Sequence, residues 1–123
     1  MVPLDKLRTI VHNYNMNEAK PIDVEHSNVF EKWLKKLKDP QARARINDRI
    51  RRLKKGNPGD SKSFGDIVEM RIDYAAGYRL YYKEFNKKII VMLCGGDKTK
   101  QQEDIDKARK IAKVYEKEYK HEN

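Results

Sequence analysis

Residues 69–82, with the sequence EMRIDYAAGYRLYY, span the end of one strand-like segment and most of the next. Apolar and polar side chains alternate across residues 66–73, with Met70 and Ile72 on one face, which predicts a half-buried strand. A second strand-like stretch, rich in tyrosine, occupies residues 77–85 after a very short connection. Because so short a connection suits antiparallel neighbours, the two strands should pair in that direction.

The chain downstream of this hairpin predicts a central strand and a helix. Residues 88–94 (KIIVMLC) are almost entirely apolar, as expected of a strand covered on both faces. Their short connection to the preceding strand again predicts antiparallel pairing. Thr99 and Gln102 resemble a capping box, so a final helix should begin there. The residues of its expected buried side recur every three or four positions and are Ile105, Ala108, Ala112, Tyr115 and Tyr119.

The chain upstream of the hairpin predicts a strand followed by two helices. Residues 21–26 (PIDVEH) alternate as a short strand would. Asn28 and Glu31 resemble a capping box, and Asp39 ends that helix and caps a second one. The apolar sides of the two helices consist of Phe30, Trp33, Leu34 and Leu37, and of Ala42, Ile46, Ile50 and Leu53.

These elements predict an α+β fold in the order β-α-α-β-β-β-α, with a mostly antiparallel four-stranded sheet, a helical hairpin and a C-terminal helix. Residues 3–14 predict an extra N-terminal helix, which a polar linker follows. We therefore expect residues 1–19 to be an N-terminal extension of short helix and linker, and residues 20–123 to form the main domain.

Charge and composition narrow the classes of function. The 123 residues carry a net charge of +9, and residues 28–55 alone hold 11 basic and 3 acidic side chains. Such a block suits either a polyanion-binding face or a solvated helix surface. No apolar run reaches the length of a membrane helix, and no signal-peptide pattern is seen, so a cytoplasmic protein is expected. A single cysteine, Cys94, excludes an internal disulfide and disfavours a zinc site.

Four motifs, in this order and spacing, carry a resemblance to a known family. They are QARARI (41–46), RIRRLKKGNPGD (49–60), EMRIDYAAGYRLYY (69–82) and LCGGDKTKQQEDI (93–105). They resemble the RelE/ParE superfamily of toxins from bacterial type II toxin–antitoxin modules. Within it they are most similar to the HigB-like addiction module killer proteins, which are related to a phage Gp49-type group. The resemblance covers residues 20–123.

The resemblance implies a RelE-like toxin domain that acts as an mRNA endonuclease, an mRNA interferase, often on the ribosome and without metal or other cofactor. It also implies a cognate antitoxin, typically a small helix-turn-helix protein of the HigA type, through which operator DNA could be bound. Two other functions remain open. The ParE branch of the superfamily has a similar fold but inhibits DNA gyrase, and the basic helices could belong to a non-catalytic nucleic-acid-binding module.

Arg71, Arg79 and Lys98 are the candidate catalytic residues. Strand alternation directs Arg71 away from Met70 and Ile72, so two guanidiniums on neighbouring strands could clamp one phosphate. The same arginines could instead pair with Glu69, Asp73 or Glu84. Gly95 and Gly96 precede the last helix and could direct backbone N–H groups at an anion, beside Lys98. The resemblance supports basic residues at these strand positions and in this segment.

Several further residues have more than one interpretation. The general base stays open between Lys98, Glu69 and a ribosomal group. Tyr78, Tyr81 and Tyr82 could stack on bases or belong to the core, whereas Trp33 and Cys94 are expected in the core. The candidate RNA-binding residues are Lys100, Arg51, Arg52, Lys54, Lys55 and Lys62.

Overall fold

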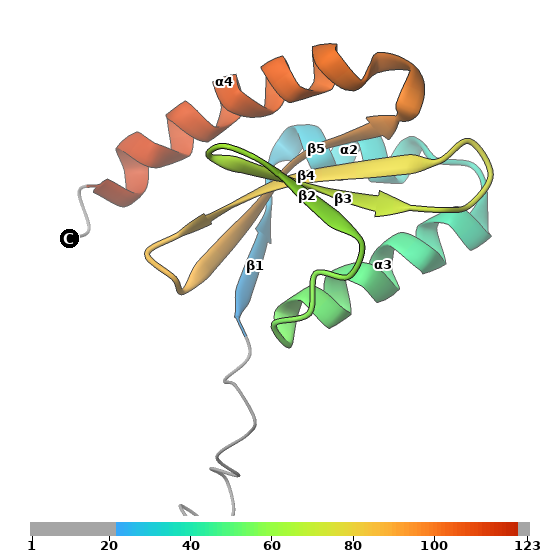
Figure 1. Cartoon of the computed structure of the whole chain (residues 1–123), viewed down its shortest axis with the longest axis horizontal. Coiled ribbons are helices and arrows are strands. Elements are labelled where there is room, and N and C mark those ends of the chain that lie inside the picture. The colour runs from blue at the N-terminus through green and yellow to red at the C-terminus, as the bar shows by residue number, and fades with distance from the viewer. Residues whose placement is uncertain (1–21, 121–123) are drawn as a thin grey trace, which may run out of the picture.

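A computed structural model describes residues 22–120. Its elements run in the order strand, two helices, four strands and a last helix, with a short 3₁₀ turn before that helix (Figure 1). They are β1 (Asp23–His26), α2 (Asn28–Lys36), α3 (Pro40–Lys54), β2 (Ser61–Phe64), β3 (Ile67–Ile72), β4 (Tyr78–Phe85), β5 (Ile89–Asp97), η1 (Lys98–Lys100) and α4 (Gln101–Lys120). The predicted helix at residues 3–14 lies outside the described residues.

The sheet has five strands in the order β1-β5-β4-β3-β2, which corrects the four-stranded prediction. β1 is parallel to β5, and every other neighbouring pair is antiparallel. The strand that the sequence did not reveal is β2, which has the sequence SKSF and pairs with β3 alone. β2 lies at the edge of the sheet, with one strand edge unpaired, and it is short and polar. It therefore lacks the apolar alternation by which a strand is recognised in a sequence.

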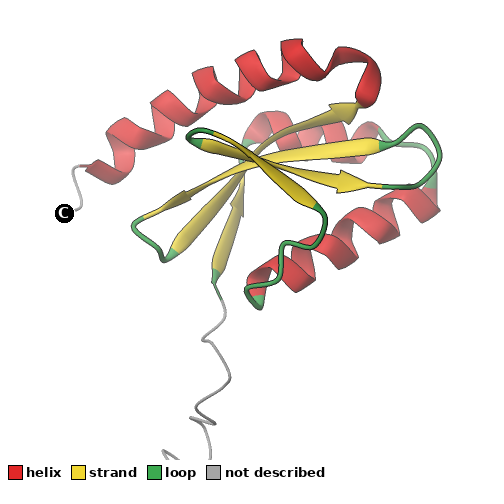
Figure 2. Ribbon diagram, in the orientation of Figure 1, coloured by secondary structure: helices red, strands yellow, loops and turns green. Residues whose placement is uncertain are grey.

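The sheet separates two cores. α2 and α3 cover one face, where Phe30 and Ile46 pack against Met70 and Met92. α4 covers the other face, where Ile105 and its neighbours pack against β5 (Figure 2). β5 contributes to both cores and is buried from Ile90 to Cys94, which confirms the prediction of a central strand covered on both sides.

The helix starts differ in detail from the predictions. Asp39 caps α3 as predicted, with Pro40 in the first turn. α2 is capped by Ser27 instead of Asn28: the Ser27 hydroxyl accepts from the Phe30 N–H at 3.0 Å and donates to the Leu93 carbonyl at 2.6 Å. Both roles need a buried residue that touches β5, and a local sequence pattern does not reveal that contact.

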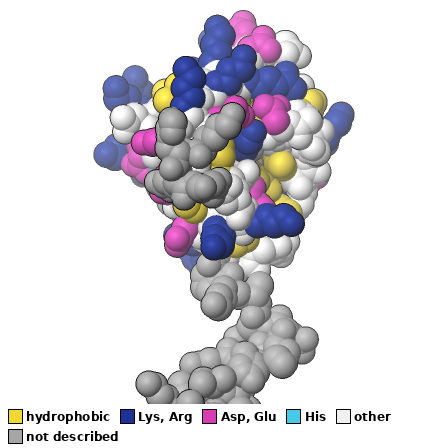
Figure 3. Space-filling view, turned by 90° about the vertical axis from the view of Figure 1, so that its left-hand side faces the viewer, with side chains coloured by type: hydrophobic (Ala, Val, Ile, Leu, Met, Phe, Trp, Pro, Cys, Tyr) yellow, Lys and Arg dark blue, Asp and Glu magenta, His cyan; other side chains and the backbone are white. Residues whose placement is uncertain are grey.

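The surface carries both signs of charge. Figure 3 shows the end of the molecule that holds the C-terminal part of α4, and basic and acidic side chains lie together there. Among residues 22–120, no helix has the length and apolar character needed to cross a membrane.

Candidate active site

Arg71, Arg79 and Lys98 come together in one cavity. Arg71 on β3 is the direct cross-strand partner of Arg79 on β4, so the predicted strand alternation is confirmed. Lys98 follows β5 and lines the same cavity, whose volume is about 290 Å³. The other lining residues are Asp60, Ile72, Asp73, Ala75, Gly77 and Tyr78. The structure therefore brings three cations from three separate segments to one place.

A buried carboxylate, Glu69, holds the two arginines on this face of the sheet. Its side chain is 0% exposed. It accepts hydrogen bonds from Arg71 Nε at 2.9 Å, from the Tyr81 hydroxyl at 2.9 Å and from Gln101 Nε2 at 2.8 Å. Arg79 Nε lies 3.5 Å from the same carboxylate. The ion pairs with Glu69 that the sequence left open are therefore present, alongside the shared cavity.

The network keeps its groups charged. Burial by itself raises the pKa of Glu69, but hydrogen bonds from Arg71, Gln101 and Tyr81 and the charge of Arg79 outweigh it, so the pKa lies below its ordinary value. The hydrogen bond to Glu69 in turn raises the pKa of Arg71.

Arg79 retains unused hydrogen-bond donors. Its Nε and Nη1 atoms are buried and have no hydrogen-bond partner within residues 22–120. Buried donors of this kind cost free energy unless a ligand supplies an acceptor. Nε lies beside Glu69, so Nη1 and the ammonium group of Lys98 are the groups that could donate hydrogen bonds to a phosphate oxygen.

Gly95 and Gly96 do not form the predicted turn. They belong to β5, where Gly96 lies opposite Arg79 and Gly95 opposite Leu80. A Cβ at Gly95 would overlap the Trp33 ring, and one at Gly96 would overlap the Asp104 carboxylate. These glycines therefore permit close packing of α2 and of the first turns of α4. The turn itself begins at Asp97, whose carboxylate accepts from the Thr99 N–H at 2.8 Å and caps the 3₁₀ turn in place of Thr99.

The fold and one relative place the chain among known proteins. No family model matches it. An uncharacterized protein of Haemophilus influenzae (strain ATCC 51907 / DSM 11121 / KW20 / Rd) is 48% identical over 92 residues, which are 74% of this chain and 93% of that protein. The chain belongs to the same family as this protein.

Two solved structures share the fold of this chain. One is the RelBE2 toxin–antitoxin complex of Mycobacterium tuberculosis, with a TM-score of 0.54, 19% identity, and coverage of 63% of this chain and 99% of that one. The other is a free arginine-to-alanine double mutant of the Escherichia coli toxin RelE, with a TM-score of 0.61, 16% identity, and coverage of 73% and 96%. The fold is therefore RelE-like, as the sequence predicted.

The candidate RNA-binding residues of this protein are all exposed, but they are dispersed over its surface. Arg51 and Arg52 both pair with Asp48 on α3, and Lys54 lines a separate pocket beside β1. Lys62 lies over the Phe64 ring on β2. Of the remaining two, Lys55 is the C-cap residue that follows α3, and Lys100 lies in η1.

The tyrosines and the cysteine divide by burial. Tyr81 and Tyr82 are buried, so they belong to the core, while Tyr78 lines the cavity and contacts Trp33. Cys94 is buried as expected, and burial raises the pKa of its thiol to about 12. A thiol in that state is not a nucleophile near neutral pH.

Proposed function

We propose that this protein is the toxin of a type II toxin–antitoxin module, and that it is an endoribonuclease that cleaves mRNA on the ribosome. Two observations support the proposal. The fold is that of the RelE toxins, and Arg71, Arg79 and Lys98 converge on one cavity. The convergence carries the proposal, because three cations from separate segments form the arrangement that a scissile phosphate requires.

The proposed reaction is a transesterification within the RNA. The 2′-oxygen attacks the adjacent phosphorus, the bond to the 5′-oxygen breaks, and the products are a 2′,3′-cyclic phosphate and a 5′-hydroxyl end. The 2′-hydroxyl gives its proton to a base, and the departing 5′-oxygen takes up a proton. Between these steps the phosphorane carries extra negative charge, which Arg71, Arg79 and Lys98 would stabilise.

The structure narrows the choice of base. Glu69 is fully buried and hydrogen-bonded on both carboxylate oxygens, so its role is to position the arginines and not to touch substrate. Lys98 stays a candidate. Asp60 and Asp73 are exposed and line the cavity, so they are further candidates for the base. A group of the ribosome is another.

A cognate antitoxin is the proposed partner. The M. tuberculosis structure is a toxin–antitoxin complex, which supports this role for a partner protein. The resemblance to the HigB-like group points to a helix-turn-helix antitoxin of the HigA type. Acidic or apolar segments of it would cover the basic cavity.

Single-turnover cleavage of ribosome-bound mRNA tests the proposal. Arg71→Ala, Arg79→Ala and Lys98→Ala should each slow cleavage about a hundredfold, which is the effect of removing one donor to a charged transition state. Lys113→Ala removes an exposed charge from α4 and should cleave at the wild-type rate.

Three results would contradict the assignment in different ways. Near-wild-type rates for both arginine variants would remove this cavity as the active site. Intact mRNA together with DNA breaks in expressing cells would indicate a gyrase inhibitor. RNA that is bound but never cleaved would indicate a binding module.

A further inference from the structure

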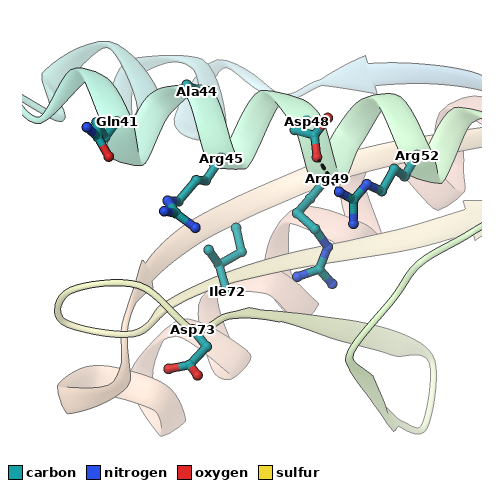
Figure 4. A pocket seen from close by; sticks show the side chains of 8 residues that line it. All are labelled: Gln41, Ala44, Arg45, Asp48, Arg49, Arg52, Ile72 and Asp73. Atoms are coloured by element: carbon teal, nitrogen blue, oxygen red, sulfur yellow. Dashed lines mark ion pairs between the residues drawn. The ribbon is translucent and has the colours of Figure 1, made fainter.

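A second and larger cavity lies between α3 and the end of β3. Its volume is about 450 Å³. Figure 4 shows Arg45 and Arg49 extending from α3 toward Ile72, with Arg52 beside the helix, where it pairs with Asp48 at 2.8 Å. The charge block of residues 28–55 thus has a concave part, which the sequence did not reveal.

Arg49 lines this cavity, and backbone carbonyls hold its guanidinium in place. Its guanidinium donates to the carbonyls of Pro58 at 2.7 Å, Asp60 at 3.0 Å and Arg71. Its Nε is buried and has no hydrogen-bond partner within residues 22–120. Carbonyl partners fix the guanidinium without neutralising it, so its full positive charge remains available to an anion.

Arg45 is exposed and carries its charge over an aromatic ring. Its guanidinium carbon lies 4.4 Å from the centre of the Tyr74 ring. A flat cation placed on a ring in this way presents its outer face to a further planar group.

The lining combines the three chemical characters of a nucleotide. Arg49 and Arg52 supply positive charge for a phosphate, while Ala44 and Ile72 supply apolar surface for a base. The amide of Gln41 and the carboxylate of Asp73 can hydrogen-bond to a base edge. A bare phosphate would leave the apolar surface unused.

The two cavities are neighbours. Ile72 and Asp73 line both of them, and Arg49 bonds the carbonyls of Arg71 and Asp60, which line the first. A strand whose phosphate lies at Arg71 and Arg79 can therefore continue past Asp73 into the second cavity. We propose that this cavity binds the nucleotide next to the scissile phosphate of single-stranded RNA. The inference rests on the proposed ribonuclease function and adds a second binding position to it.

The test is binding of 2′-O-methyl oligonucleotides, which cannot undergo attack by the 2′-oxygen, in lengths from two to eight nucleotides. The variant is Arg45→Gln/Arg52→Gln, because both side chains are exposed and Arg49 also supports the backbone. It should bind the eight-nucleotide probe about tenfold more weakly than wild type, with a salt slope shallower by about 0.7, the value for one phosphate contact. It should bind the dinucleotide as the wild type does.

Controls separate this inference from the proposed function. Lys110→Gln/Lys113→Gln removes two exposed charges from α4, which covers the opposite face of the sheet, and should leave binding of both probes unchanged. Arg79→Ala should weaken binding of both lengths. The decisive quantity is the gain in affinity from the dinucleotide to the eight-nucleotide probe. If wild type binds and cleaves RNA but this gain is the same in the Arg45→Gln/Arg52→Gln variant, the second position is overturned and the proposed function stands. If wild type cleaves ribosome-bound mRNA but binds no free probe, the second position is overturned and the proposed function stands. If it neither binds a probe nor cleaves ribosome-bound mRNA, both fail.

Discussion

At the scale of single residues, Glu69 shows what strand alternation hides. The pattern places it on the polar face of β3 together with Arg71, and such a face is normally solvent-exposed. In the structure the start of α4 covers that face, and Gln101 and Tyr81 bond to the carboxylate. A polar face that a distant helix covers has the same sequence pattern as one that meets water. The buried centre of the site was therefore not predictable, although the arginines around it were.

Glu69 should make the stability of the protein depend on pH. Its folded-state pKa is lower than the ordinary value of 4.5, so it stabilises the fold above about pH 4.5. That contribution is lost as pH falls through the lower folded-state pKa. Glu69→Gln should cost about 1–3 kcal/mol at pH 7, because a neutral amide leaves the arginines poorly paired.

Urea denaturation at pH 7 and at pH 3 measures this effect. The difference between wild type and Glu69→Gln should shrink at the lower pH, because below about pH 4.5 the unfolded chain binds a proton at Glu69 more readily than the folded protein does. Tyr81→Phe removes one hydrogen bond without removing the charge, so its cost should change less between the two pH values. Equal losses for Glu69→Gln at both pH values would contradict the assigned ion pairs.

At the scale of elements, local patterns predicted most of the strands and helices. Apolar periodicity marked the helices α2 and α3 and the strands β3, β4 and β5, because each of them buries a continuous side. β2 was missed because it is a polar edge strand, and the start of α2 was displaced because its Ser27 cap also contacts β5. The cap at Asp97 is a local contact with Thr99 that the capping-box pattern did not include. The Gly95-Gly96 pair was misassigned as a turn because glycine also marks close approach between elements.

The packing of α2 on β5 should depend on the absence of a side chain at Gly95. A methyl group there would overlap the Trp33 ring, which is held between Phe30 and Tyr78. Gly95→Ala should destabilise the protein by about 1–3 kcal/mol, the usual cost of overpacking. Gly96→Ala should cost less, because its nearest neighbour is the end of the Asp104 side chain, which can turn aside.

Urea unfolding compares the two variants. Trp33 is the only tryptophan of the chain, so its fluorescence reports directly on the disturbed contact. Its emission should shift in folded Gly95→Ala and stay as in wild type in Gly96→Ala. Equal stabilities with unchanged emission would show that α2 moves to accept the methyl group at no cost.

At the scale of the whole molecule, the candidate site arises where separate segments meet. Strand alternation predicted that Arg71 and Arg79 share a face, and the structure shows them as cross-strand partners. Lys98 was expected beside them because of a Gly95-Gly96 turn; the turn is absent, but Lys98 does line their cavity. The cavity formed by Arg45, Arg49 and Arg52 was not predictable, because it depends on how α3 is rotated against β3. Their spacing fits a solvated helix face equally well, and only the packed sheet decides between the two.

Residues 22–120 should fold without the residues that precede Met16. Both cores and all three candidate catalytic residues lie within residues 22–120. A chain that starts at Met16 should therefore fold, cleave RNA as the full chain does, and melt within about 4 °C of it, which corresponds to less than about 1 kcal/mol. A chain that starts at Ser27 is the matched comparison, because it lacks β1. That deletion removes the parallel pairing with β5 and the Glu25 carboxylate that accepts from the Tyr119 hydroxyl at 2.5 Å, so cooperative melting should be lost or strongly lowered. A melting temperature more than about 8 °C lower for the Met16 chain would instead show that residues 1–15 pack against the domain.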